Sequence, residues 1–166
     1  MAFKIDDRVV YPALGIGRVV GLVVKRLVDA GVRQYYEISL GKNTVWVPVD
    51  AGAGSGLRPL TSRVDLARYR DVLRGCPRLL TPDHRQRDAD LRTRLQAGSF
   101  QDFCEVVRDL TARAWQKPLG EKDSASLRKG RDAVCQEWAA TDGVSVTLAT
   151  AEVNALLLEG RENHQA

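Results

Sequence analysis

The sequence lacks long hydrophobic runs, and none of its stretches approaches the roughly 18 consecutive apolar residues that a membrane-spanning helix needs. Residues 1–7 also lack the apolar stretch of a secretory signal peptide. These two absences predict a soluble protein of the cytoplasm. The hydrophobic content, 44% of 166 residues, is nevertheless enough to bury a core in one large domain or two small ones.

Cysteine and histidine are scarce. Cys76, Cys104 and Cys135 are odd in number, widely spaced and without a Cys-x-x-Cys pair, which excludes a disulfide framework and a zinc knuckle. We expect reduced, mostly buried thiols. Because the other histidine, His164, lies in a polar tail, metal or triad chemistry would rest on His84 alone. We therefore expect no metal, no cofactor and no enzymatic activity.

The numbers of basic and acidic residues are nearly equal. Lys and Arg number 25 against 21 Asp and Glu, which gives a formal net charge of +4 and an isoelectric point near 9.1. A basic protein suits a polyanionic partner such as DNA, but most of the basic residues are interleaved with acidic ones. Composition alone therefore supports DNA binding only weakly.

The first part of the chain has the composition of β-strands. β-Branched and aromatic residues predict strands over residues 9–11, 16–24, 34–40 and 44–49. The segments between them, 29–31 and 41–43, have the length and the residues of hairpin turns. So few strands bury an inner face best when they curl, which predicts a small bent sheet or barrel.

Residues 51–56, AGAGSG, break this pattern and mark the junction between two domains, 1–58 and 59–166. The second domain has helical spacing. The first two expected helices run from Ser62 to Gly75 and from Asp83 to Gly98. The third begins at a capping box, Ser99 with Asp102, and ends at Pro118. The fourth has Asp123 as its N-cap and extends through Trp138, and the fifth covers residues 147–159. The fold class is therefore α+β, a bent sheet followed by a bundle of about five helices.

Two glycine patterns resemble phosphate-binding loops. The glycines of residues 52–56 follow no strand that leads into a helix, and no Lys-Ser/Thr pair comes after them, so a linker is favoured. Residues 15–17, Gly-Ile-Gly, precede a predicted strand, which favours a tight bend over dinucleotide binding. Neither pattern indicates an active site.

Basic residues gather in two of the expected helices: Arg85, Arg87, Arg92 and Arg94 in the second, and Arg128, Lys129 and Arg131 in the fourth. Two such helices could present cations to a phosphate backbone. The alternative is an ordinary solvated helix face, because acidic residues lie among the cations. Charge alone favours the solvated face.

A specific resemblance carries the functional hypothesis. Residues 3–17 read FKIDDRVVYPALGIG and resemble the F-x-x-G-D-x-V-V-Y-P-x-x-G-x-G opening of the CarD/CdnL family of bacterial transcription regulators. The likeness continues in register at 35–36, 45–49 and 56–58, and more weakly at 106–110 and 127–131. It covers nearly the whole chain.

This resemblance implies a partner and a set of contact residues. The family has a Tudor-like N-terminal domain that binds the RNA polymerase β subunit, and a helical C-terminal domain that contacts promoter DNA at the upstream edge of the bubble. The positions that match the polymerase-facing edge are Lys25, Trp46, Val47 and Pro48, with core packing as the alternative for Trp46. The implied DNA contacts are His84, Arg85, Arg87, Arg128, Lys129 and Arg131.

The chain departs from the family at the DNA contact. His84 occupies the place of a tryptophan that wedges into the minor groove, and Gln86 and Ala89 occupy usual basic positions. An imidazole offers less apolar area than an indole, which predicts weaker or differently placed DNA contacts. The alternative function is a polymerase-interaction module with little or no wedge activity. The oligomeric state stays open.

Overall fold

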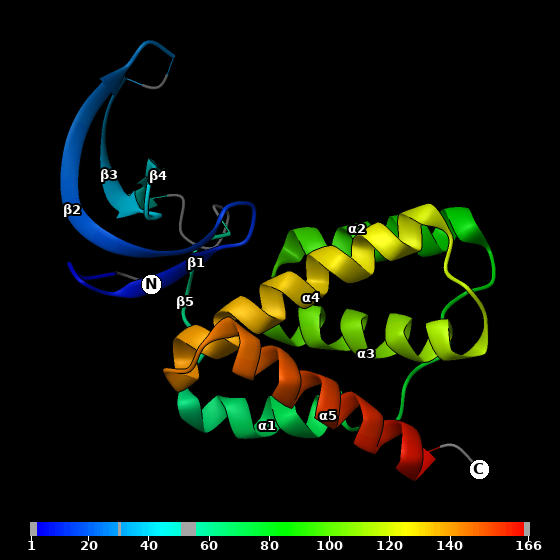
Figure 1. Cartoon of the computed structure of the whole chain (residues 1–166). Coiled ribbons are helices and arrows are strands. Elements are labelled where there is room, and N and C mark those ends of the chain that lie inside the picture. The colour runs from blue at the N-terminus through cyan, green and yellow to red at the C-terminus, as the bar shows by residue number, and fades with distance from the viewer. Residues whose placement is uncertain (1–2, 30, 51–55, 165–166) are drawn as a thin grey trace. The chain divides into compact units, whose positions relative to one another are not determined.

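The structure is a computed structural model that describes residues 3–29, 31–50 and 56–164. The chain divides into two compact units, Met1–Leu60 and Thr61–Ala166, which Figure 1 colours from blue to teal and from green to red. The predicted border lay between residues 58 and 59. In the structure the short strand β5 (Arg58–Pro59) still pairs within the first unit. Residues 51–55 of the expected linker lie outside the described residues.

The first unit is an antiparallel sheet with the strand order β4-β3-β2-β1-β5. The other strands are β1 (Arg8–Tyr11), β2 (Gly15–Leu27), β3 (Gly31–Ser39) and β4 (Thr44–Pro48). Strand β2 pairs with β1 near its start and with β3 over the rest, and its register with β3 shifts between Val19 and Gly21. Such a bulge increases the bend, and Figure 1 shows β2 and β3 as one strongly curved hairpin. The predicted bent sheet is confirmed.

The Gly-Ile-Gly pattern belongs to this bend. Gly15 has a φ of 109°, a conformation that L side chains rarely adopt. A Cβ atom on Gly17 would lie 2.7 Å from side-chain carbons of Ile38 and Leu40 and 2.8 Å from the Ser39 carbonyl oxygen. Gly15 therefore allows the backbone to turn into β2, as the predicted bend requires, and Gly17 allows the close approach of β2 to β3.

Asp6 takes a conformation that usually belongs to glycine. Its φ is 77°, and it is the one residue other than glycine with a positive φ among the described residues. The opening pattern of the CarD/CdnL family has glycine at this position. The Asp6 amide donates a hydrogen bond of 2.7 Å to the Val19 carbonyl, and the Val19 amide donates one to the Asp7 carbonyl. These two bonds hold the left-handed residue in place.

The second unit is a bundle of helices. They are α1 (Arg63–Leu73), α2 (His84–Ala97), α3 (Phe100–Gln116), α4 (Glu121–Asp142) and α5 (Val146–His164). The predicted helix starts at Ser62, Asp83 and Ser99 are confirmed: each of these residues is an N-cap whose side chain accepts a hydrogen bond from a backbone amide of the first turn. Gly98 ends α2 in the left-handed conformation. In Figure 1, α4 runs along α2 and α3, and α5 runs along α1.

Two predicted helix ends were wrong. The N-cap of α4 is Gly120, and Asp123 lies inside the first turn, where it is buried. Helix α5 continues past the predicted end at residue 159 to His164. A Cβ atom on Gly160 would lie 2.9 Å from the Arg74 carbonyl oxygen, so this glycine allows α5 to pack against the end of α1 rather than ending the helix.

Each unit has its own hydrophobic core. Val9, Val19, Tyr36, Ile38, Val47 and Leu57 fill the first, with Val45 and Leu40 packed against them. The second core surrounds the fully buried Trp138. Cys104 and Cys135 are buried there, as predicted for most of the thiols, whereas Cys76 is exposed. Among the described residues, no helix has the length and apolar character to span a membrane.

Candidate functional site

The first candidate surface lies on strand β4, an outer strand of the described sheet. Trp46 lies outside the hydrophobic core, with 44% of its surface exposed. The Lys25 Nζ atom sits over the indole, 3.2 Å from the ring centroid. A cation this close to an indole face is attracted by the negative face of the ring. Two residues that the resemblance singled out, from β2 and β4, therefore meet in one contact.

Val47 and Pro48 are placed differently from Trp46. The Val47 side chain is only 4% exposed and packs in the core of the first unit, while Pro48 is partly buried. Side chains of neighbouring strand residues point to opposite faces, so Trp46 faces outward where Val47 faces inward. The Leu40 amide bonds to the Asn43 carbonyl, and the alternation along the ladder then turns the backbone of Val47 toward β3 and that of Trp46 toward the open edge. A partner strand can therefore meet both the side chain and the backbone of Trp46, whereas Pro48 has no amide hydrogen to donate.

The surroundings of Trp46 are charged. Glu37 is its register partner on β3, and Lys25 pairs in register with Arg33. Glu37 and Lys25 therefore place one carboxylate and one cation beside the indole, and Arg33 adds a second cation next to Lys25. Such an aromatic side chain flanked by charges is typical of a protein contact, because it supplies apolar area inside a polar rim.

The second candidate surface begins at helix α2. His84 is its first residue and is exposed, as is Arg85. The Asp83 carboxylate accepts hydrogen bonds from the Arg85 and Gln86 amides, at 2.9 and 3.3 Å, and so fixes the start of the helix. The imidazole of His84 therefore projects to solvent from an ordered helix end.

Arg87 does not fit its predicted place on this surface. It is buried, and its Nε donates to both carboxylate oxygens of Asp123, at 3.0 and 3.3 Å. Its Nη1 donates to the Thr81 and Pro82 carbonyls, at 2.9 and 3.2 Å. These bonds tie the loop before α2 to the first turn of α4 and hold the Arg87 side chain inside the helical unit, away from the surface on which a phosphate contact was predicted.

A groove of about 280 Å³ separates α2 from α4. Arg92, Lys122 and Lys129 line it, together with Asp88, which pairs with Arg92 at 2.9 Å and with Lys122 at 3.9 Å. Lys122 was missed by the sequence analysis. The signal was its spacing of seven residues from Lys129, which places both on one face of α4.

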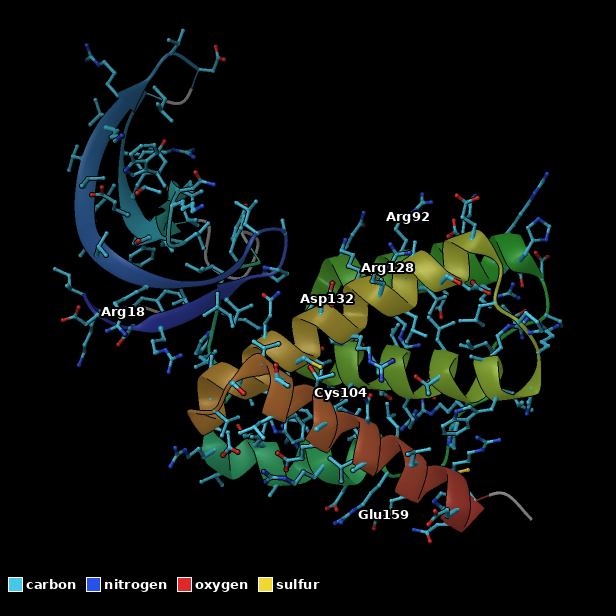
Figure 2. The ribbon with its side chains drawn as sticks, in the orientation of Figure 1. Arg18, Arg92, Cys104, Arg128, Asp132 and Glu159 are labelled. Atoms are coloured by element: carbon cyan, nitrogen blue, oxygen red, sulfur yellow. The ribbon has the colours of Figure 1, made fainter. Side chains whose placement is uncertain are left out.

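The remaining predicted cations lie around this groove or away from it. Arg128 and Lys129 are exposed, and Arg131 is partly buried. Figure 2 shows Arg92 and Arg128 on the side of the helical unit formed by α2 and α4, with Asp132 further along α4, whereas Glu159 of α5 lies on the opposite side. Arg92, Lys122, Arg128 and Lys129 thus form the α2–α4 basic face, and Asp88, which pairs with Arg92 and Lys122, neutralises only part of its charge.

Among the described residues, no group of three or more His, Cys, Asp and Glu side chains could hold a metal ion.

Two protein-family models match this chain and show which family it belongs to. The CarD-like/TRCF RID domain model matches residues 3–60, and the CarD, C-terminal domain model matches residues 69–154. The chain belongs to the CarD family. The two matched regions fall in the two structural units, so the Tudor-like sheet is the RID domain, the RNA polymerase-interacting domain of this family.

A curated relative agrees with this assignment. The chain is 27% identical over 146 residues to the "Putative transcription factor YdeB" of Bacillus subtilis (strain 168). The alignment covers 86% of this chain and 94% of that protein, so the likeness extends over both domains. The protein is thus a transcription regulator of the CarD family.

Proposed function

We propose that this CarD family protein binds the β subunit of RNA polymerase through strand β4 and contacts promoter DNA with its helical domain, modulating open-complex stability without catalysis. The observation that carries the proposal is the exposed Trp46 on an outer strand of an RID domain, with Lys25 over its ring. The β4 edge supplies the contact to polymerase, and the α2–α4 basic face supplies the contact to DNA.

The chemistry of β4 supports a strand-to-strand contact. Among the described residues, one side of β4 pairs with β3, and no strand pairs with its other side. A partner strand gains hydrogen bonds there, while an exposed indole adds apolar area. Aromatic side chains dominate the energetics of many protein interfaces, so most of the affinity should depend on Trp46.

The α2–α4 basic face supports a contact to the phosphate backbone. Its cations are on two neighbouring helices, at the rim of a groove and largely exposed. Lys and Arg side chains of this kind bind phosphates with little regard to base sequence. We propose that His84, which is exposed at the start of α2 where the family has tryptophan, acts as a small wedge beside the bubble.

Polymerase binding is tested with Trp46→Ala. The full-length variant should lose at least tenfold in affinity for RNA polymerase and for the isolated β subunit, measured by biolayer interferometry, because a central aromatic contact is worth about 2 kcal/mol or more. The control is Leu148→Ala, which removes an exposed apolar side chain from α5. Equal affinity of the two variants for the β subunit would contradict the proposal.

A second function, a polymerase-interaction module without a promoter role, is favoured by two observations. His84 replaces the wedge tryptophan, and Arg87 is occupied inside the helical unit. The two functions differ in how promoter DNA changes polymerase affinity. Phosphate contacts require an increment that falls as salt rises. Absence of such an increment favours the module.

A further inference from the structure

The helical unit contains a pocket that the proposed function does not use. It has a volume of about 180 Å³ and lies between the loop 76–80, the second half of α3 and the last turns of α5. These segments meet at the end of the unit where α3 and α5 finish, as Figure 1 shows. The groove of the α2–α4 basic face is a separate cavity and shares no lining residue with this pocket.

One part of the lining is apolar. Pro77, Leu80, Ala112 and Trp115 contribute to it, and Leu80 also packs against the core. A cavity of about 150 Å³ is large enough for benzene. The pocket therefore has the size and the apolar surface for a ligand with one aromatic ring.

The other part of the lining is cationic. Arg78, Arg113 and Arg161 line the pocket, and the Arg161 guanidinium lies 4.9 Å from the centroid of the Trp115 ring. The ion pairs of Arg78 with Glu105 and of Arg113 with Asp123 measure 3.9 and 3.7 Å, longer than a hydrogen bond. An anion in the pocket can therefore gain charge-assisted hydrogen bonds from these side chains.

The carboxylate in the lining does not cancel this charge. Asp109 is 2% exposed, and its Oδ1 accepts hydrogen bonds from the Arg78 amide at 2.9 Å and from the Arg108 Nε at 2.8 Å. It is thus satisfied by the protein itself. The described residues of the lining leave a net positive charge beside an apolar wall.

We propose that this pocket binds a small organic anion, a carboxylate or phosphate ester that carries a single aromatic ring. The ring lies against Trp115 and Leu80, and the anionic group is held by the arginine side chains. Neither the apolar wall nor the cations alone select such a ligand, because a neutral ring gains no charge-assisted hydrogen bond from the arginines and a bare anion leaves the wall uncovered.

The pocket is connected to the start of α2, a consequence that rests on the proposed function. Loop 76–80 leads through Thr81 and Pro82, whose carbonyls accept from Arg87, to Asp83 and His84. A bound ligand restrains this loop and so the position of His84. In this way the pocket would couple a small anion to the DNA contact.

The experiment is an NMR titration of the full-length protein, without polymerase or DNA, with three probes. Benzoate and phenyl phosphate carry the anion on one ring, and benzamide is the neutral counterpart of benzoate. We expect saturable amide shifts confined to residues 76–80, 109–116 and 160–164, and an affinity for the two anions about tenfold higher than for benzamide, the effect of one charge-assisted contact.

Variants separate the two parts of the pocket. Arg161→Gln should weaken benzoate binding about tenfold and change benzamide binding far less, since it removes a positive charge but keeps a polar side chain. Ala112→Leu fills the space on α3 with a good helix former and should abolish binding of all three probes. Lys117→Gln, an exposed cation just after α3, is the matched control and should change nothing.

Three results would overturn the proposal. They are no saturable shifts with any probe, equal affinity for benzoate and benzamide, and shifts centred on the α2–α4 basic face. Because no partner is present in the titration, its failure leaves the proposed function untouched. Failure of polymerase binding by the wild-type protein in turn leaves the pocket untouched.

Discussion

At the scale of single residues, the pair of Arg87 and Asp123 shows how a cation that looks suited to DNA can belong to the interior. The two side chains are 9% and 8% exposed and lie 3.0 Å apart. Arg113 approaches the same carboxylate at 3.7 Å. A buried charge that loses its partner is strongly destabilising, even where the intact pair adds little.

The corresponding prediction concerns stability. Asp123→Ala leaves the Arg87 guanidinium buried without its counter-charge, and should lower the free energy of unfolding of the helical unit by about 3 kcal/mol or more. Urea denaturation followed by far-ultraviolet circular dichroism, which reports mainly on the helices of this unit, measures this loss. Asp132→Ala, an exposed carboxylate on the same helix, should stay within about 0.5 kcal/mol of the wild type.

One result would contradict the structural role of Arg87. If Arg87→Met weakens DNA binding while the free energy of unfolding is unchanged, the guanidinium faces the DNA and its structural role is wrong.

Asp6 provides a second prediction at this scale. A left-handed conformation is strained for residues other than glycine, and least so for Asn and Asp. Asp6→Gly should therefore stabilise the N-terminal unit slightly or leave it unchanged, whereas Asp6→Val should destabilise it by about 1–2 kcal/mol. Thermal unfolding of the two variants checks this order. A more stable Val variant would show that residue 6 has no left-handed requirement.

At the scale of helices and strands, the α2–α4 basic face is the feature that binding measurements can test. Each lysine that contacts a phosphate displaces about one counterion, so its removal should reduce the salt slope of DNA binding by about one. We expect this for Lys122→Gln and Lys129→Gln, measured by fluorescence anisotropy with a promoter fragment over a range of salt concentrations. Lys117→Gln serves as the control.

Unchanged slopes for both groove variants, with binding retained, would place the phosphate contacts elsewhere on the protein. Slopes that change equally in Lys117→Gln would indicate a diffuse charge effect rather than a groove contact.

The sequence was informative wherever local rules decide the structure. The caps Ser62, Asp83 and Ser99 follow from hydrogen bonds between neighbouring residues, and the bend at Gly15 follows from backbone conformation. Contacts between distant residues were not predictable in this way. Arg87 and Asp123 are 36 residues apart, and only the packing of α2 against α4 brings them together.

The same distinction between local rules and long-range contacts applies to the candidate site. The pattern of the resemblance led to Lys25 and Trp46, but their contact depends on the register of β2, β3 and β4. The cation Lys122 was missed because nothing in the sequence shows which face of α4 turns toward α2. The end of α5 was missed because Gly160 is a common stop signal, and only the neighbouring α1 explains why it continues.

At the scale of the whole molecule, the protein carries its two candidate contacts on separate domains. The RID domain holds the β4 edge, and the helical domain holds the α2–α4 basic face and His84. A regulator with two such contacts binds the promoter complex more tightly than either contact alone would allow, because binding to polymerase raises the local concentration of the DNA-contacting domain. Loss of either contact should then weaken the promoter effect.

The most direct test is the lifetime of the open complex on a promoter fragment with the cognate RNA polymerase. Wild type is compared with Trp46→Ala, His84→Ala and His84→Trp. The proposed function predicts that Trp46→Ala abolishes the effect of the protein on the lifetime and that His84→Trp strengthens it, since an indole offers a larger wedge. A wild-type protein that binds polymerase but leaves the lifetime unchanged would contradict the promoter role.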